Sequence, residues 1–475
     1  MRLLLACLLG GSTALAQPAA PSSTPQARIV ELRALASKGA AGAAELTEAL
    51  KDPRAPVRAA AVQLLAEVRG ASAARDIAPL TADPEDAVAV AAVASLLRLG
   101  GDVSYGAVQK ALVSPSARVR SQSAAYIGDA RDTRFTKDLG GLLSDPAPGV
   151  RHSAIEALRA AKDPASFPFL MAATADEMPE VASAAIGGLA SLGDRRALPR
   201  IAPLTSSAKV QVRAAAAGAL AALGGLTTQR EAFERSVADP DRNVRSAAAS
   251  GMRDHPSADA APFLVKLGGD AEAMVRRIVV QAWREQAGAA SADALAAFVT
   301  DANDGVRTTA IYALGTRRLT DRAPAVAARA ADPSSSVREA AAATLGDLGG
   351  PAAEAALITL SGDAEASVRA IAVVALAQQR GPKALPVLQA SLKDPDALVR
   401  LEAIRALGVL GTPEALSRLR DLAGGGDVAI RIAAIDQLGA CKDRGAIALL
   451  RKITQEPIET LRAAAKRALD AIGSQ

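Results

Sequence analysis

The sequence predicts an all-α solenoid, a right-handed superhelix of about fourteen helical pairs after one lone N-terminal helix. The pattern Asp-Pro-x-x-x-Val-Arg, or a degenerate copy of it, recurs along the chain with a nearly constant period. Half of the 475 residues are hydrophobic but only 2% are aromatic, so the interior must be built from small aliphatic side chains. Such a period, held along a chain, is typical of stacked helical repeats and not of a globular enzyme domain.

The repeat keeps its register from about residue 28 to residue 472. One clear copy is Asp332-Pro333 with Val337-Arg338, and another is Asp394-Pro395 with Val399-Arg400. Alignment on the Arg position places the repeats at residues 58, 89, 120, 151, 182, 213, 245, 276, 307, 338, 369, 400, 431 and 462, with one step of 32 among steps of 31.

Residues 1–16 predict an export signal. Met1-Arg2 is a short basic start, residues 3–11 are apolar, and Ala14-Leu15-Ala16 fits the small-x-small cleavage rule. The apolar stretch is shorter than the roughly 20 residues of a membrane-spanning helix. We therefore expect a periplasmic or secreted protein without a transmembrane segment in the mature chain. Residues 4–7 also resemble a lipoprotein box, which leaves lipidation at Cys7 as a less favoured alternative.

The solenoid is expected to occupy residues 24–475 as one domain, after a disordered Pro/Ser/Ala tether at 17–23. Its opening segment, residues 28–35, matches residues 400–407 position by position but has no first helix before it. This match predicts a lone second helix at the start. Removal of the signal leaves Cys441 as the one remaining cysteine, so the mature chain has no internal disulfide.

Each repeat is expected to contain two helices, for which residues 383–411 serve as the template. Residues 383–393 have helical apolar spacing, and Asp394-Pro395 is expected to cap and begin the second helix. Gly411 predicts a left-handed helix end. Four aspartates are expected to cap first helices: Asp132, Asp163, Asp194 and Asp443. Five prolines stand near the start of first helices, and the sequence leaves open whether they lie in the first turn or bend it: Pro168, Pro199, Pro262, Pro324 and Pro386.

Residues 176–245 collect several departures from the repeat. Ala182 replaces the Arg, Ser207 replaces the Asp, two Gly-Gly pairs occur, and the one longer step of the repeat falls here. We expect a soft joint or a change of curvature in this stretch.

The Asp-Pro-x-x-x-Val-Arg turn, followed by Ala-Leu-Gly-x-Leu-Gly at residues 406–411, resembles the HEAT repeat, in its short bacterial form that is also called the phycobilisome-lyase HEAT-like repeat. This resemblance implies an armadillo-like α-solenoid in which second helices line the concave face. It also implies a ladder of charge-assisted hydrogen bonds between neighbouring repeats, built from turn Asp and second-helix Arg residues. The expected ladder pairs are Asp52 with Arg58, Asp145 with Arg151, Asp239 with Arg245, Asp270 with Arg276, Asp301 with Arg307, Asp332 with Arg338, Asp363 with Arg369, and Asp394 with Arg400.

Catalytic motifs are nearly absent from the sequence. The two histidines, His152 and His255, lie about three repeats apart, which excludes a two-histidine metal site within one chain. We predict no enzyme activity, no metal and no cofactor. The net charge of +5 is small for 475 residues, so nucleic-acid binding is poorly supported. Trp283 takes the place of Leu407 in its repeat and is expected in the core.

The expected concave face consists of second-helix residues one, two, five and nine after the Arg. Most are small, and a surface of this kind suits a protein or extended peptide better than a small molecule. The candidate contacts are Gln122, His152, Glu156, Arg277, Gln281, Tyr312 and Arg405.

These observations favour a non-enzymatic, protein-binding scaffold or adaptor of the bacterial cell envelope. The alternative is an accessory or regulatory subunit of an envelope enzyme complex. A chromophore lyase is the third hypothesis, disfavoured by the export signal and by the scarcity of His and Cys.

Overall fold

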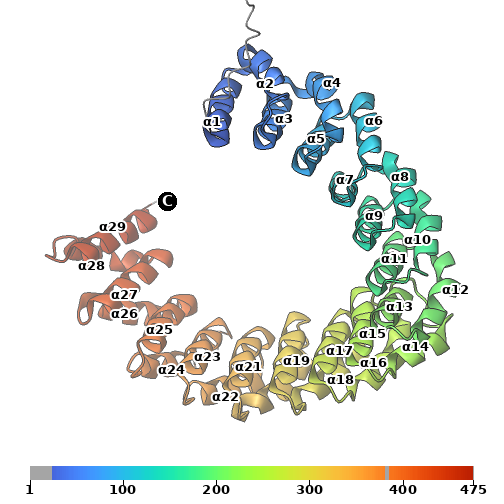
Figure 1. Ribbon diagram of the computed structural model, residues 1–475. Helices are drawn as coiled ribbons and strands as arrows, with labels where there is room; N and C mark the ends of the chain where they lie inside the picture. The colour runs from blue at the N-terminus through green and yellow to red at the C-terminus, as the bar shows by residue number, and fades with distance from the viewer. Residues whose placement is uncertain (1–23, 380–383, 474–475) are drawn as a thin grey trace, which may run out of the picture. The chain divides into compact units, whose positions relative to one another are not determined.

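The computed structural model describes residues 24–379 and 384–473, and in these residues every regular element is helical. The predicted export signal, the tether and Cys7 lie outside the described residues. Helix α1 (Pro25–Ala36) comes first and alone, and fourteen pairs follow it, so the predicted all-α solenoid is confirmed (Figure 1).

The second helices of the pairs are the longer set. They are α3 (Ala55–Arg69), α5 (Asp86–Leu99), α7 (Ala117–Ala130), α9 (Pro148–Ala161), α11 (Pro179–Leu192), α13 (Val210–Ala222), α15 (Arg242–Asp254), α17 (Ala273–Glu285), α19 (Asp304–Thr316), α21 (Ser335–Leu348), α23 (Ala366–Gln379), α25 (Ala397–Leu410), α27 (Val428–Ala440) and α29 (Glu459–Gly473).

The first helices are shorter, and several are extended by 3-10 turns. They are α2 (Ala43–Ala49), α4 (Ala74–Ile77), α6 (Gly101–Ala111), α8 (Thr136–Gly141), α10 (Phe167–Ala173), α12 (Leu198–Ile201), α14 (Arg230–Val237), α16 (Ala261–Gly268), α18 (Ala289–Ala297), α20 (Ala323–Ala327), α22 (Pro351–Leu360), α24 (Ala384–Ser391), α26 (Pro413–Gly424) and α28 (Ile447–Ile453).

The chain divides into two compact units, one up to Arg200 and the other from Ile201. This boundary lies inside residues 176–245, where the repeat is most irregular. Within each unit, the second helices stack side by side as the inner layer and the first helices form the outer layer (Figure 1). A solenoid of this kind gains its stability from contacts between neighbouring repeats.

The core lies between the two layers of helices. In α25 the buried face carries Val399, Ala403, Ile404 and Leu407, all with 0% exposure. Trp283 is 4% exposed, which confirms it as a core residue. Because the core side chains are small, adjacent second helices approach each other closely.

Glycine permits the closest of these approaches. A Cβ added to Gly128 of α7 would lie 2.9 Å from the Cα of Ala157 in α9. A Cβ on Gly439 of α27 would lie 2.8 Å from the Cα of Ala468 in α29. Real Cβ atoms are not found this near to a neighbouring backbone, so a larger residue at either position would push the two helices apart.

The expected caps of the first helices are present. Asp132, Asp163, Asp194 and Asp443 each accept a hydrogen bond from the backbone N–H two residues ahead. Each therefore caps the 3-10 turn that opens the first helix. Four of the five prolines lie in the first helical turn, where each is the second residue of its helix: Pro168, Pro199, Pro262 and Pro324. Pro386 lies near the start of α24, directly after residues 380–383, which the structure does not describe.

The start of the second helix differs from the prediction. Asp394-Pro395 does not begin α25, which starts at Ala397 with Asp396 as its N-cap. The Asp394 carboxylate accepts the N–H of Asp396 at 2.9 Å and thereby closes a turn before the helix. Gly411 ends α25 in the left-handed conformation, with φ of 60°, as predicted.

Candidate functional site

The repeat Arg joins two successive turns of the solenoid. Arg245 donates from Nε to Asp270 Oδ2 at 2.6 Å and from Nη2 to Asp270 Oδ1 at 3.0 Å. Its Nη1 donates to the backbone carbonyl of Asp239 at 2.8 Å. The two side chains of the ion pair are 15% and 5% exposed. One guanidinium therefore holds the turn of its own repeat and the carboxylate of the next.

This geometry corrects the pairing expected from the sequence. The prediction joins each Arg to the Asp of its own repeat, whereas the Asp side chain binds the Arg of the preceding repeat, at a sequence separation of 25 or 26. The carboxylate of its own repeat is thus already engaged, so the Arg uses the backbone carbonyl there. The ion pairs are Arg58–Asp83, Arg120–Asp145, Arg151–Asp176, Arg213–Asp239, Arg245–Asp270, Arg276–Asp301, Arg307–Asp332, Arg338–Asp363 and Arg369–Asp394.

Two of the expected residues are used differently. Arg28, which matches Arg400 in the lone first helix, pairs with Glu31 at 2.7 Å, and the carboxylate of Asp52 instead pairs with Arg54 at 2.7 Å. Arg400 donates to the backbone carbonyls of Asp394 and Pro395 only, among its hydrogen bonds in the described chain. Asp83 belongs to the ladder although its own repeat has Ala89 at the Arg position, which is why same-repeat pairing overlooked it.

The ladder is electrostatically strong. The hydrogen bonds from Arg120 lower the pKa of Asp145 below its ordinary value, and those from Arg369 do the same for the pKa of Asp394. The carboxylates are therefore ionised and engaged within the protein. Charged groups used in this way hold neighbouring repeats together and are not free to bind a partner.

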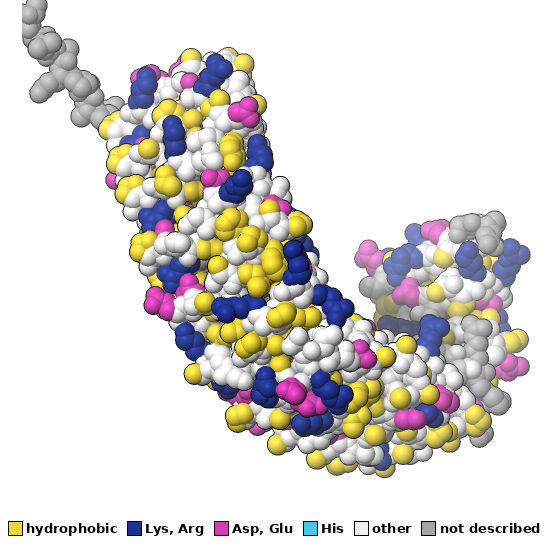
Figure 2. Space-filling view, turned by 90° about the vertical axis from the view of Figure 1, so that its right-hand side faces the viewer, with side chains coloured by type: hydrophobic (Ala, Val, Ile, Leu, Met, Phe, Trp, Pro, Cys, Tyr) yellow, Lys and Arg dark blue, Asp and Glu magenta, His cyan; other side chains and the backbone are white. Residues whose placement is uncertain are grey.

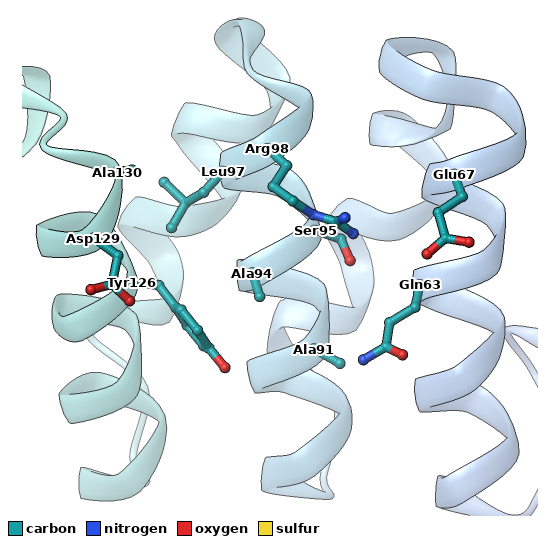
Figure 3. Close-up of a pocket in the computed structure, with 10 residues that line it drawn as sticks. All are labelled: Gln63, Glu67, Ala91, Ala94, Ser95, Leu97, Arg98, Tyr126, Asp129 and Ala130. Carbon is teal, nitrogen blue, oxygen red and sulfur yellow. The ribbon is translucent and has the colours of Figure 1, made fainter. Parts of the chain in front are cut away.

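A hollow of about 530 Å³ opens on the layer of second helices in the first unit, between α3, α5 and α7 (Figure 3). Its floor is formed by small residues of α5, among them Ala91 and Ala94. Gln63 of α3 and Tyr126 of α7 stand on the two sides, and Arg98 extends from α5 toward α3 (Figure 3). Small residues on the middle helix thus create the space, and larger polar residues surround it.

Charged residues of alternating sign surround this hollow. Glu67, Arg98 and Asp129 stand nine residues after the Arg position in three successive repeats, and all three line it. Each is exposed. These three side chains form a row of two carboxylates and one guanidinium, which can bind a partner that carries both polar and basic groups.

Ser95 supplies an unusual buried group at the floor of the hollow. Its side chain is 1% exposed, and its Oγ has no hydrogen-bond partner in the described protein. A buried hydroxyl without a partner is costly, by about 1 to 3 kcal/mol. A ligand group that reached the floor could satisfy it.

A second hollow, of about 500 Å³, lies on the same layer of the second unit, between α21, α23 and α25. Its lining is more apolar and includes Ile371, Val374 and Leu398, with Asp347 and Glu402 at its edges. Leu398 is 48% exposed. The two hollows use equivalent positions on the first and middle helices of each set, but different positions on the third helix, and they offer different chemistry.

The candidate contacts named from the sequence lie on second helices, outside the residues that line these two hollows. Gln122 lies on α7, His152 and Glu156 on α9, Arg277 and Gln281 on α17, Tyr312 on α19, and Arg405 on α25. Tyr312 is 49% exposed. Glu156 pairs with Arg159, Arg405 pairs with Glu402, and Gln281 accepts a hydrogen bond from Arg253.

Sequence reasoning overlooked Arg98 and Ser95. Arg98 stands at the exposed position nine after Ala89, so its place in the repeat is the signal that could have found it. Ser95 is six after Ala89, a position that the pattern assigns to the core.

Among the described residues, no group of three or more His, Cys, Asp or Glu side chains could hold a metal ion. Burial raises the pKa of the Cys441 thiol, which donates to the carbonyl of Gly408 at 3.3 Å.

On the face seen in Figure 2, basic and acidic side chains are interspersed. No helix within 24–379 or 384–473 is both long enough and apolar enough to cross a membrane.

Comparison with known proteins decides the family. The HEAT-repeat family matches five overlapping stretches: 106–181, 168–237, 230–315, 292–365 and 354–431. These matches cover more than half of the chain. The chain is a HEAT-repeat protein. No curated protein matches this HEAT-repeat chain in sequence.

Solved structures of similar fold include large HEAT solenoids. Kap95p in its complex with RanGDP superposes with a TM-score of 0.58 at 13% identity, over 94% of this chain and 72% of that one. The Kap95:Nup1 complex gives 0.60 at 14%, over 94% and 73%. Kap121p gives 0.59 at 13%, over 95% and 63%. At such identities the likeness concerns the fold of this HEAT-repeat protein.

Proposed function

We propose that this HEAT-repeat protein is a non-enzymatic scaffold of the bacterial cell envelope that binds proteins or extended peptides on its layer of second helices. The observation that carries the proposal is the hollow between α3, α5 and α7, where a floor of small residues is surrounded by Gln63, Glu67, Arg98, Tyr126 and Asp129. A broad surface with shallow hollows suits a polypeptide, because a small molecule would need a deeper and more enclosed cavity.

The kind of partner follows from the chemistry of the two hollows. In the first unit, alternating carboxylates and a guanidinium favour polar and basic side chains. In the second unit, Ile371, Val374 and Leu398 favour an apolar side chain. We infer that an extended segment, or two segments, engages these places separately. Kap95p is structurally similar and has been solved with Nup1, which supports the use of such a fold for protein binding.

The test is site-specific photo-crosslinking of the full chain in its native cells. A photoreactive amino acid at position 94, in the floor of the first hollow, should capture a defined protein. The same group at Val265, which is 68% exposed on α16 of the outer layer, is the matched control. Capture at position 94 should weaken in the variant Arg98→Glu, which replaces the positive charge between Glu67 and Asp129 with a negative one. Equal capture from both positions, or substrate turnover by the purified protein, would contradict the proposal.

The proposed location has its own test. Intact mass measurement of the protein recovered from cells should show a chain that begins at Gln17, in the periplasmic or secreted fraction. A chain that retains Met1 in the cytosolic fraction would overturn the export proposal, and a lipidated Cys7 would establish the lipoprotein alternative. We also propose that the repeats of this protein belong to the short bacterial, lyase-type form of the HEAT repeat.

A further inference from the structure

The ladder contains one place where the Arg is kept and the carboxylate is missing. Arg400 and Gly425 have the same separation in the sequence as Arg369 and its partner Asp394. Arg400 is fixed in the usual way on its own side, with Nη1 donating to Asp394 O at 2.7 Å and to Pro395 O at 2.8 Å. Its Nε and Nη2, which in other repeats hold the next carboxylate, have no hydrogen-bond acceptor within the described chain.

The space for a carboxylate is present at this place. A Cβ built on Gly425 meets no atom within 4 Å. In complete copies, the ladder carboxylate also accepts the N–H two residues ahead, as Asp394 accepts that of Asp396 at 2.9 Å. The corresponding N–H here belongs to Asp427, and Gly425 offers it no side chain. Arg400 and the N–H of Asp427 are therefore the counterparts, by position in the repeat, of the donors that bind the carboxylate in complete copies. The backbone at Gly425 is extended, with φ of −174°.

The carboxylate nearest Arg400 in the sequence, and the one nearest Gly425, are already engaged. Glu402 pairs with Arg405 at 3.3 Å. The Asp427 side chain caps α27 by accepting the N–H groups of Ala429 and Ile430 at 2.9 Å and 3.2 Å. Neither can replace the missing ladder residue without giving up these bonds.

The other interrupted places in the ladder do not leave an open guanidinium. Where Ser114 replaces the acid, the preceding Arg position is Ala89, so both charges are lost together. Where Glu456 replaces it, the longer acid still reaches Arg431 Nη2 at 2.7 Å. Between neighbouring repeats of the described chain, Arg400 is thus the ladder Arg that is retained without its acid.

We propose that Arg400 and the turn at Gly425 form a binding site for a carboxylate supplied by another polypeptide, namely an Asp or Glu side chain. The complete copies of the ladder show what this donor arrangement binds, with two charge-assisted hydrogen bonds from Nε and Nη2. Leu398, 48% exposed, and Leu401, 38% exposed, lie in the same helical turn as Arg400. These exposed apolar side chains on the same helix favour a segment in which the acidic residue has an apolar neighbour.

Acetate is the first probe, compared with chloride at equal ionic strength in thermal unfolding of the full chain. Acetate should raise the Tm of the native protein, because a ligand that binds the folded state stabilises it. Arg400→Gln should lose this increment. Gly425→Asp should raise the Tm without acetate, by completing the ladder, and should also lose the increment. Gly425→Glu provides a second filling variant with the reach shown by Glu456.

Arg444→Ala is the matched control, because Arg444 is an exposed Arg of the same unit outside the ladder and should not change the response to acetate. An equal acetate increment in all variants would overturn the site. An equal increment with inorganic phosphate would also contradict it, since a carboxylate-shaped site should prefer acetate.

A peptide arm identifies the source of the carboxylate. An amidated peptide with an internal Asp beside Leu should bind to the native chain and not to Gly425→Asp. Stronger binding by a peptide whose only carboxylate is its C-terminus would overturn the assignment to a side chain. The peptide arm rests on the proposed scaffold function. The acetate arm does not, and its failure would leave the crosslinking result at position 94, in the other unit, unaffected.

Discussion

Ala89 and Ser114 occupy the two ends of a missing ion pair. Their separation in the sequence is the same as that of Arg120 and Asp145, which form the ion pair of the next repeat. Ser114 keeps the turn, since its Oγ accepts the N–H of Ser116 at 3.3 Å. The loss of both charges at one place has a physical reason, because a half-buried charge without its partner costs more than the absence of the pair.

This relationship predicts the energetics of a complete ion pair. Arg245→Ala or Asp270→Ala alone should lower the free energy of unfolding by about 3 kcal/mol, because each leaves a mostly buried charge unpaired. The double variant Arg245→Ala with Asp270→Ser copies Ala89 and Ser114, and should cost clearly less than the sum of the single losses. Denaturant unfolding followed by circular dichroism measures all three.

The control for this series is Arg242→Ala. Arg242 lies 3.8 Å from Glu272 with its side chain 67% exposed, so its removal should cost less than about 1 kcal/mol. Additive losses in the double variant would mean that Arg245 and Asp270 act independently.

The ladder also predicts acid sensitivity. The pKa values of Asp145, Asp363 and Asp394 are lowered, chiefly by hydrogen bonds from Arg120, Arg338 and Arg369. A carboxylate with a lowered folded-state pKa contributes stability above its unfolded value of about 3.9, and this contribution is lost as the pH falls through the folded value. We expect Tm to be nearly constant from pH 5 to pH 7 and to fall steeply below about pH 4. A Tm that declines equally between pH 7 and pH 5 would point to other groups.

Close packing of second helices makes a prediction about glycine. Gly128→Ala should destabilise the protein by about 1 to 3 kcal/mol, because the new Cβ would lie 2.9 Å from the backbone of Ala157. Gly149→Ala is the matched control, since a Cβ in that helical position meets nothing within 4 Å and alanine favours the helix. Thermal unfolding should therefore shift downward for the first variant and slightly upward for the second.

The irregular stretch predicts where the folded protein is first cut. The one longer step of the repeat falls between Arg213 and Arg245, and residues 223–229 connect α13 to α14 there. We expect thermolysin to cleave first within 223–229 and to release two resistant fragments, identified by mass. Deletion of the exposed Thr227, which restores the period of the other repeats, should slow this cleavage. Cleavage spread evenly along the chain, or confined to its ends, would contradict the expected joint.

The sequence by itself determined the fold class, the number of helical pairs and the position of the first-helix caps, because each depends on local spacing that repeats many times. It also determined that Trp283 is buried, since its place in the repeat is a core position. Tertiary structure decided which Arg holds which Asp, because the partner lies one repeat away and same-repeat spacing alone cannot reveal it.

Tertiary structure likewise decided where the surface is hollow. The space between α3, α5 and α7 arises from small residues on one helix and larger ones on its two neighbours, which belong to the preceding and the following repeat. Arg98 and Ser95 acquire their roles only when these helices lie side by side. Local periodicity fixes what every repeat shares, whereas packing between repeats brings together the side chains in which repeats differ.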